Sequence, residues 1–147
     1  MSSKNIKQHN SYDISLLQSK AYRMVKTKIN EALEKSDISA TDWAILGALE
    51  SADEPLLFGE LAESAGVTAP RITIVVNNLK NKGWVSIKMD SSDSRRKRVA
   101  LSKKGKNFIK STEKKVQSVI QDFFSDIPAK QTEYYFKVLE KISEKHI

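Results

Sequence analysis

The sequence predicts a mainly α-helical protein with one small β-hairpin. Apolar residues recur at helical spacing along most of the 147 residues, and only residues 84–101 show the alternation that is typical of strands. Hydrophobic residues make up 39% and charged residues 29%, a balance that is typical of a folded domain. A chain of this length is most simply one unit, so we expect a single domain over residues 1–147.

The composition also excludes several classes of protein. No apolar run approaches the roughly 20 residues that span a bilayer, and the polar N-terminus has no signal-peptide core. Since the chain has no cysteine, it can form neither disulfide bonds nor thiolate metal sites. We therefore expect a cytoplasmic protein that does not bind a membrane.

Two helices are predicted before the first strong break in the chain. Apolar residues at helical spacing over residues 14–33 indicate one long amphipathic helix. Ser39 or Thr41 can cap a second helix that continues to Leu49, because a side-chain oxygen there can accept a free backbone N–H. The acidic residues and the proline at 53–55 end this helix.

A short helix over residues 59–65 and a longer one over residues 68–82 have the spacing of a helix-turn-helix. Gly66 can end the first helix in the left-handed conformation, and Thr68 can cap the second. On a helical wheel, four apolar residues of the second helix form one stripe, opposite a largely uncharged polar surface. This predicted buried stripe consists of Ile72, Val75, Val76 and Leu79.

The polar surface of the second helix suits the major groove of double-stranded DNA. There, arginine can pair with guanine, asparagine can pair with adenine, and an apolar side chain can contact the methyl group of thymine. We therefore predict a recognition helix over residues 68–82. Its candidate DNA-binding residues are Thr68, Arg71, Thr73, Ile74, Asn77 and Asn78.

Residues 84–89 and 98–101 predict two antiparallel strands that are joined by a basic loop, the wing, over residues 90–97. The window from 80 to 106 holds ten basic and two acidic residues, and its net charge of +8 exceeds the +7 of the whole chain. Such a concentration of positive charge predicts binding to a polyanion such as the DNA backbone. A solvated charge run is the alternative, which the flanking strand-like segments disfavour. The candidate DNA-binding residues here are Asp93, Arg95, Arg96, Lys97 and Arg98.

Two more helices are predicted after Gly105, over residues 108–127 and 135–142, with Pro128 between them. Together with the first helix, they carry more apolar surface than the small helix-turn-helix lobe can cover. Exposed stripes of this length indicate an interface, so we expect a two-fold homodimer. We assign residues 41–102 to a DNA-binding lobe, and residues 12–35 and 104–147 to dimerisation helices.

Between residues 43 and 105 the chain resembles the MarR family of winged helix-turn-helix transcriptional regulators, particularly its SlyA-like members. The most specific match is Asp93-Ser94-Arg95 followed by Leu101-Ser102 and Gly105, which resembles the family's Asp-x-Arg wing and its Leu-Thr/Ser-x-x-Gly motif. The other matching segments are Trp43-Ala44-Ile45-Leu46, Glu60-Leu61-Ala62, Gly66-Val67, Ile72-Thr73, and Leu79 with Lys82-Gly83.

The resemblance implies a homodimer that binds double-stranded DNA, with Arg95 in the minor groove and oriented by an ion pair to Asp93. We expect a repressor that binds a pseudo-palindromic operator. The chain departs from the family pattern at Ile74, where many relatives carry arginine, and at Ser94, where a basic residue is frequent. Arg71 also stands where the family often has threonine. The operator sequence therefore cannot be carried over from relatives.

Members of the family often bind anionic aromatic ligands between the DNA-binding lobe and the dimerisation helices. Lys20, Tyr22 and Arg23 resemble positions that contact such an effector in some relatives, and Trp43 is a further candidate. The favoured alternative is that Tyr22 belongs to the core and that the two cations are solvated, because single cations on amphipathic helices are common.

Enzymatic activity is not expected from this sequence. The two histidines lie far apart, so no cluster of metal ligands is visible, and there is no glycine-rich phosphate loop or nucleophile elbow. We expect neither a cofactor nor a metal. The alternative to a DNA-binding regulator is a winged-helix module that binds protein or RNA without an operator, which leaves the basic wing without a role.

Overall fold

The computed structural model describes residues 8–145, and its elements follow the predicted order with two short additions. The ends of the expected domain, residues 1–7 and 146–147, lie outside the described residues. The helices are α2 (Ser11–Leu33), α3 (Ala40–Ser51), α4 (Phe58–Ala65), α5 (Ala69–Asn81), α6 (Lys103–Phe123) and α7 (Ala129–Ser143). The additions are a 3-10 turn, η1 (Glu34–Ser36), and a strand, β1 (Leu56–Leu57).

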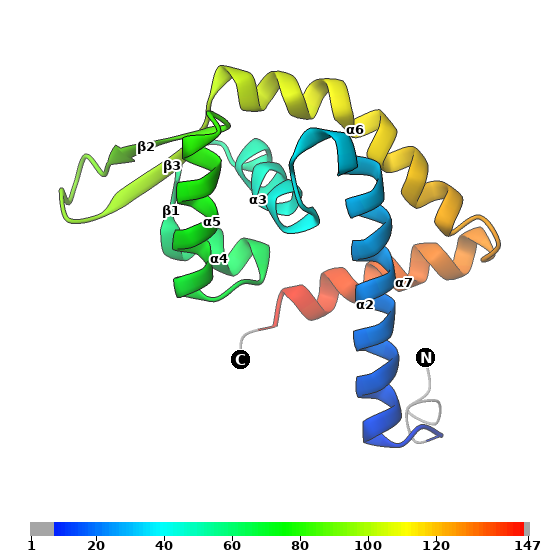
Figure 1. The fold of residues 1–147 in the computed structure, drawn as a ribbon. Coiled ribbons are helices and arrows are strands. Elements are labelled where there is room, and N and C mark those ends of the chain that lie inside the picture. The colour runs from blue at the N-terminus through cyan, green and yellow to red at the C-terminus, as the bar shows by residue number, and fades with distance from the viewer. Residues whose placement is uncertain (1–7, 146–147) are drawn as a thin grey trace.

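The helices and the hairpin divide the molecule into two regions. Helices α4 and α5 and the β-hairpin lie at one end, whereas the N-terminal part of α2 and helix α7 lie at the other (Figure 1). Helix α6 runs from the hairpin along α2 toward α7 and connects the two regions. None of the helices within residues 8–145 is long and apolar enough to cross a membrane.

The core lies where α2, α3, α4, α5, the middle of α6 and the sheet meet. The predicted apolar stripe of α5 is confirmed, because Ile72, Val75, Val76 and Leu79 are all buried. Burying one large aliphatic side chain contributes about 1.5–3 kcal/mol, so this stripe is a main reason why α5 stays fixed on the lobe. The largest fully buried side chains are Leu33, Ile45, Leu46, Leu61, Ile72, Leu79, Val76 and Val99.

The sheet has three strands in the order β1-β3-β2, where the sequence predicted two. Strands β2 (Val85–Met89) and β3 (Lys97–Leu101) form the predicted antiparallel hairpin, with Val85 opposite Leu101 and Met89 opposite Lys97. The additional strand β1 pairs with the other edge of β3. It has only two residues, too few for an alternating pattern to be visible, so its pairing depends on the tertiary fold.

The turn between α4 and α5 has the predicted geometry. Gly66 ends α4 with a positive φ of 66°, and the N–H of Val67 donates to the carbonyl of Ala62 at 3.0 Å. The hydroxyl of Thr68 then accepts the N–H of Arg71 at 3.4 Å and caps α5. The two caps end α4 and begin α5 within a short turn, as the helix-turn-helix prediction requires.

The ends of the terminal helices differ from the prediction. Helix α6 begins at Lys103, before Gly105, and it ends at Phe123, so Ile127 lies in the following turn. Helix α7 begins at Ala129, directly after Pro128. Apolar periodicity marks only the residues that pack, whereas caps set the ends of a helix, and here the cap of α6 is Ser102.

Gly105 is required where α6 meets the hairpin. The Ser102 hydroxyl caps α6 by accepting the N–H of Gly105 at 3.0 Å, and the N–H of Ser102 donates to the carbonyl of Trp84 at 3.1 Å. The first turn of α6 is thereby held against the start of β2. A Cβ atom on Gly105 would overlap the carbonyl oxygen of Trp84.

We predict that Gly105→Ala lowers the free energy of unfolding by about 1–3 kcal/mol, because the added methyl group meets backbone that cannot move aside cheaply. Chemical denaturation of the parent and the variant measures the loss. Gly47→Ala is the matched control, since a Cβ atom there meets nothing within 4 Å. This control should leave stability unchanged or raise it by about 0.5–1 kcal/mol, and equal losses in both variants would contradict the assignment.

Candidate nucleic-acid interface

The predicted contact residues of α5 are exposed together on one side of the helix. The exposed set comprises Thr68, Arg71, Thr73, Ile74, Asn77 and Asn78. Since the opposite side of α5 is buried in the core, this face is the part of the helix that a groove of DNA could receive.

Only part of this face has free hydrogen-bonding groups. The hydroxyl of Thr68 caps the helix, and that of Thr73 donates to the carbonyl of Ala69 at 3.2 Å. Within residues 8–145, the side chains of Arg71, Asn77 and Asn78 make no hydrogen bond or ion pair. Their donors and acceptors are therefore available to base edges or phosphates.

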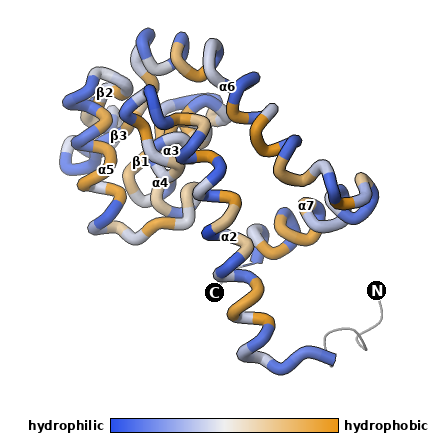
Figure 2. Tube along the Cα trace, turned by 45° about the vertical axis from the view of Figure 1, so that its right-hand side comes forward, coloured by the Kyte–Doolittle hydropathy of each residue, from blue (hydrophilic) through white to orange (hydrophobic). Residues whose placement is uncertain are grey.

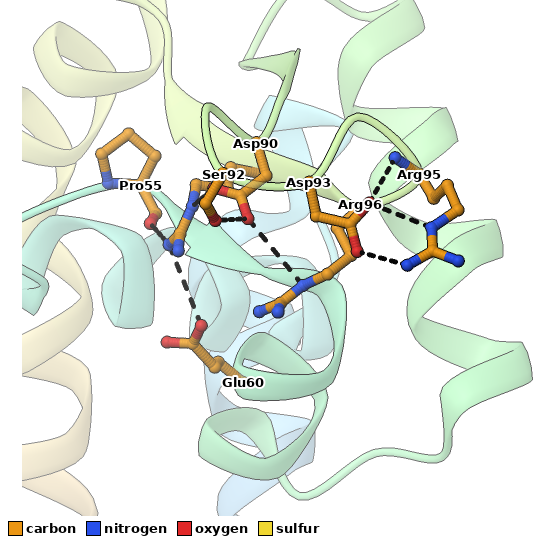
Figure 3. A network of polar contacts seen from close by, with 8 residues as sticks. Pro55, Glu60, Asp90, Ser92, Asp93, Arg95 and Arg96 are labelled. Carbon is orange, nitrogen blue, oxygen red and sulfur yellow. Dashed lines mark hydrogen bonds and ion pairs between the residues drawn. The ribbon is translucent and has the colours of Figure 1, made fainter.

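In the wing, Asp93 and Arg95 form the ion pair that the family resemblance implies (Figure 3). The carboxylate of Asp93 accepts the Nε of Arg95 at 3.1 Å and its Nη2 at 3.2 Å. It also accepts the backbone N–H of Arg95 at 3.0 Å. The hydrogen bond from the Arg95 side chain is the main reason why the pKa of Asp93 is lowered from its ordinary value.

Arg95 stays accessible although it is paired. Its side chain is 89% exposed, whereas that of Asp93 is 27% exposed. The bidentate contact restricts the direction of the guanidinium without covering it, and several of its N–H groups remain free for a further acceptor. The arrangement is a cation that is oriented in advance and still open to an anion.

A second network fixes the base of the wing. The buried carboxylate of Asp90 accepts the Nε of Arg98 at 2.9 Å and the hydroxyl of Ser92 at 2.9 Å. Arg98, the unlabelled side chain in Figure 3, also donates to the carbonyl of Pro55 at 2.8 Å and lies 3.9 Å from Glu60 of α4. The hydrogen bond from Arg98, followed by that from Ser92, holds the pKa of Asp90 below its ordinary value.

The remaining predicted wing contacts fall into two groups. Arg96 and Lys97 are exposed, and the Nε of Arg96 is 3.9 Å from a carboxylate oxygen of Asp90. The guanidinium of Arg98, in contrast, faces the protein and its side chain is only 26% exposed. The sequence alone grouped all these cations as DNA contacts. The contact with Asp90 turns Arg98 inward, but in the sequence Asp90 looks like an ordinary polar residue of the loop.

Two lysines beside the interface also have partners within the protein. The Nζ of Lys82 donates to the carbonyl of Asp37 at 2.9 Å and pairs with its carboxylate at 3.2 Å. The Nζ of Lys104 donates to the carbonyl of Lys82 at 2.8 Å and lies 4.4 Å from the centre of the Trp84 ring. These charges link the end of α5 to α6 and to the segment after α2.

A family model described as the MarR family matches residues 36–96. A Bacillus subtilis (strain 168) protein, named as the uncharacterized HTH-type transcriptional regulator YpoP, is 30% identical over 126 residues, which cover 86% of this chain and 77% of that protein. The chain belongs to the MarR family of transcriptional regulators.

Solved structures confirm the fold. A MarR-family transcriptional regulator from Rhodococcus sp. RHA1 matches with a TM-score of 0.83 at 23% identity, over 93% of this chain and 96% of that chain. The MepR–DNA complex of S. aureus matches with a TM-score of 0.77 at 23% identity, over 91% of this chain and 97% of that chain. The predicted winged helix-turn-helix with long terminal helices is therefore the MarR fold.

The residues that resemble effector contacts of MarR proteins lie in different surroundings. Lys20, Tyr22 and Arg23 are exposed on α2, and Tyr22 is 67% exposed, so its ring does not belong to the core of the single chain. Trp43 is half-buried and packs edge-on against Phe108, with ring centroids 5.9 Å apart. An effector site formed by these residues stays a prediction.

We predict that Asp90→Asn lowers the thermal unfolding midpoint at neutral pH. Since the pKa of Asp90 is lowered by folding, its contribution to stability is present above the unfolded value of about 4 and is lost as the pH falls through the lower folded value. The difference in thermal unfolding midpoint between the parent and the variant should therefore become smaller below about pH 4.

Thermal unfolding followed from pH 7 down to pH 3 measures this difference. Asp53→Asn is the matched control, because Asp53 is exposed in the turn after α3. It should melt like the parent at every pH. A loss in Asp90→Asn that has the same size at all pH values would contradict the ionic role of this carboxylate.

Proposed function

We propose that this MarR-family protein is a homodimeric transcriptional regulator that binds double-stranded DNA with α5 in the major groove and the wing in the minor groove. The observation that carries the proposal is Arg95, which is 89% exposed and yet oriented by Asp93. A planar guanidinium held in this way suits the narrow, strongly negative minor groove of A·T-rich DNA.

The polar face of α5 supports the same assignment. Arg71, Asn77 and Asn78 have unpaired side chains, and both residue types can make bidentate hydrogen bonds to base edges in the major groove. The exposed cations Arg96 and Lys97 can neutralise phosphates beside the wing. We assign Arg98 to holding the wing in place rather than to DNA, because its partners are Asp90 and Pro55.

The homodimer follows from apolar surface that the single chain leaves uncovered. Helix α7 has no buried residue, although apolar residues recur along it (Figure 2). The large exposed apolar side chains of α2 and α7 are Tyr12, Leu16, Leu17, Tyr22, Met24, Tyr134, Tyr135, Phe136, Val138, Leu139 and Ile142. A monomer rarely exposes so much, and a second copy related by a two-fold axis is the commonest solution.

A two-fold dimer presents two copies of α5 and of the wing to the DNA. We therefore propose a pseudo-palindromic operator with half-sites about one helical turn apart. We propose repression as the output, because a dimer that covers two half-sites excludes other proteins from the same DNA. The S. aureus MepR–DNA complex, which has the same fold, supports the DNA-binding part of this proposal.

For DNA binding we predict a steep salt dependence that involves Arg95. The affinity for a duplex selected from random DNA should fall with salt at a log–log slope of several units, since each neutralised phosphate contributes about 0.9. Arg95→Ala should weaken binding at least tenfold and reduce the slope by about one per protomer. Asp93→Ala should weaken it less, because the cation remains and loses only its orientation.

Titrations of each variant at three or more salt concentrations give these slopes. Lys130→Ala is the matched control, because it removes one exposed cation per protomer from α7, outside the DNA-binding lobe. It should bind like the parent. A flat salt dependence, or no binding to any duplex at low salt, would leave the protein- or RNA-binding module as the better interpretation.

For the dimer we predict that Leu139→Asp produces monomers at micromolar concentration, because it places a charge in the apolar face of α7. Leu139 is 41% exposed in the single chain, so its replacement should not disturb the fold. Phe123 is a poorer probe, since its ring packs against Phe124 of the same chain.

Light scattering gives the mass of the parent and of each variant. Gln131→Asp, an equally drastic change at an exposed polar position of α7, should remain dimeric. A parent protein with the monomer mass of 16.6 kDa would refute the dimer.

A further inference from the structure

Ile74 is an apolar side chain at the centre of the exposed face of α5. It is 62% exposed, and between residues 40 and 101 the only other large apolar side chain with comparable exposure is Met89 of β2. The exposed apolar residues of α2 and α7 fall on the proposed dimer face, but Ile74 belongs to the opposite end of the molecule, with α5 and the hairpin (Figure 1). The dimer does not explain it.

The stability of the helix does not explain Ile74 either. A β-branched residue loses side-chain freedom in a helix. At an exposed position of α5, alanine, lysine or glutamine would therefore stabilise the helix more than isoleucine does. Because its side chain is largely in water, Ile74 also contributes little to the core. A surface that covers Ile74 when the protein is bound would give this side chain a role that the isolated chain does not.

The neighbours of Ile74 indicate what that surface is. Arg71 precedes it by three residues, and Asn77 and Asn78 follow it by three and four, so all four share one face of the helix. The three polar side chains are unpaired within residues 8–145. A face with hydrogen-bonding groups around one aliphatic group matches the major groove, where donors and acceptors surround the methyl group of thymine.

We propose that Ile74 makes the protein specific for a thymine in each half-site by packing against the 5-methyl group of that base. Among the four bases, thymine alone presents an apolar group at its major-groove edge. An aliphatic side chain cannot satisfy the amino group of cytosine or adenine, so the contact also disfavours those bases. This inference rests on the proposed function, since it requires α5 to enter the major groove.

The experiment removes the methyl group and nothing else. Each thymine of a duplex selected from random DNA is replaced in turn by deoxyuridine, which keeps every base pair. Covering one methyl group changes the affinity about fourfold. Replacement of one particular thymine in either half-site should therefore weaken binding about fourfold, and replacement of this thymine in both half-sites about fifteenfold. Ile74→Ala should bind the thymine and uracil duplexes equally, and Ile74→Val should show a smaller difference than the parent.

Met89→Ala is the matched control, because Met89 is 63% exposed and lies outside α5. It should keep the full sensitivity of the parent to the thymine methyl group. If no single uracil weakens the parent, or if uracil weakens Ile74→Ala as much as the parent, the role of Ile74 is refuted while DNA binding stands. If no duplex is bound even at low salt, the proposed function and this inference fail together.

Discussion

The contact between Asp90 and Arg98 is the interaction on which the winged helix-turn-helix part of the fold depends most. The side chain of Asp90 is only 3% exposed, so its charge must be compensated inside the protein. Arg98 supplies that compensation and at the same time reaches the carbonyl of Pro55 and approaches Glu60. One guanidinium thereby joins the wing to the segment before β1 and to α4, so the wing has a fixed base.

The cations of the basic segment fall into two groups, those that hold the fold together and those that stay exposed. Arg98, Lys82 and Lys104 all have acceptors within the protein, and each of them links two elements of the fold. Arg95 is oriented by Asp93 but stays exposed, and Arg96 is also exposed, with its Nε 3.9 Å from a carboxylate oxygen of Asp90. The net charge of the segment therefore overstates the number of cations that a polyanion can reach, although its position on the molecule is informative.

The other end of the hairpin connects α5 to the long helix α6. The carbonyls of Lys82, Gly83 and Trp84 accept hydrogen bonds from the Lys104 side chain, the Ser102 hydroxyl and the Ser102 N–H. Because Gly105 brings the first turn of α6 against Trp84, the end of α5 and the start of α6 behave as one packed unit. The position of α5 is thus coupled to the helix that leads to the proposed dimer face.

Periodicity and local chemistry were sufficient to predict the main helices, the hairpin and the exposed face of α5, because amphipathic spacing, Gly66 and Thr68 act over a few residues. The Asp93–Arg95 ion pair was expected from the resemblance to the MarR family, and its two partners are only two residues apart. The sequence by itself thus determined the main helices and the hairpin, their order, and where positive charge gathers. Only the tertiary structure decided that two residues at 56–57 form a strand, because they pair with β3 more than 40 residues away in the chain. It also decided that Arg98 faces inward, because this requires a buried Asp90 carboxylate and the carbonyl of Pro55, 43 residues before Arg98.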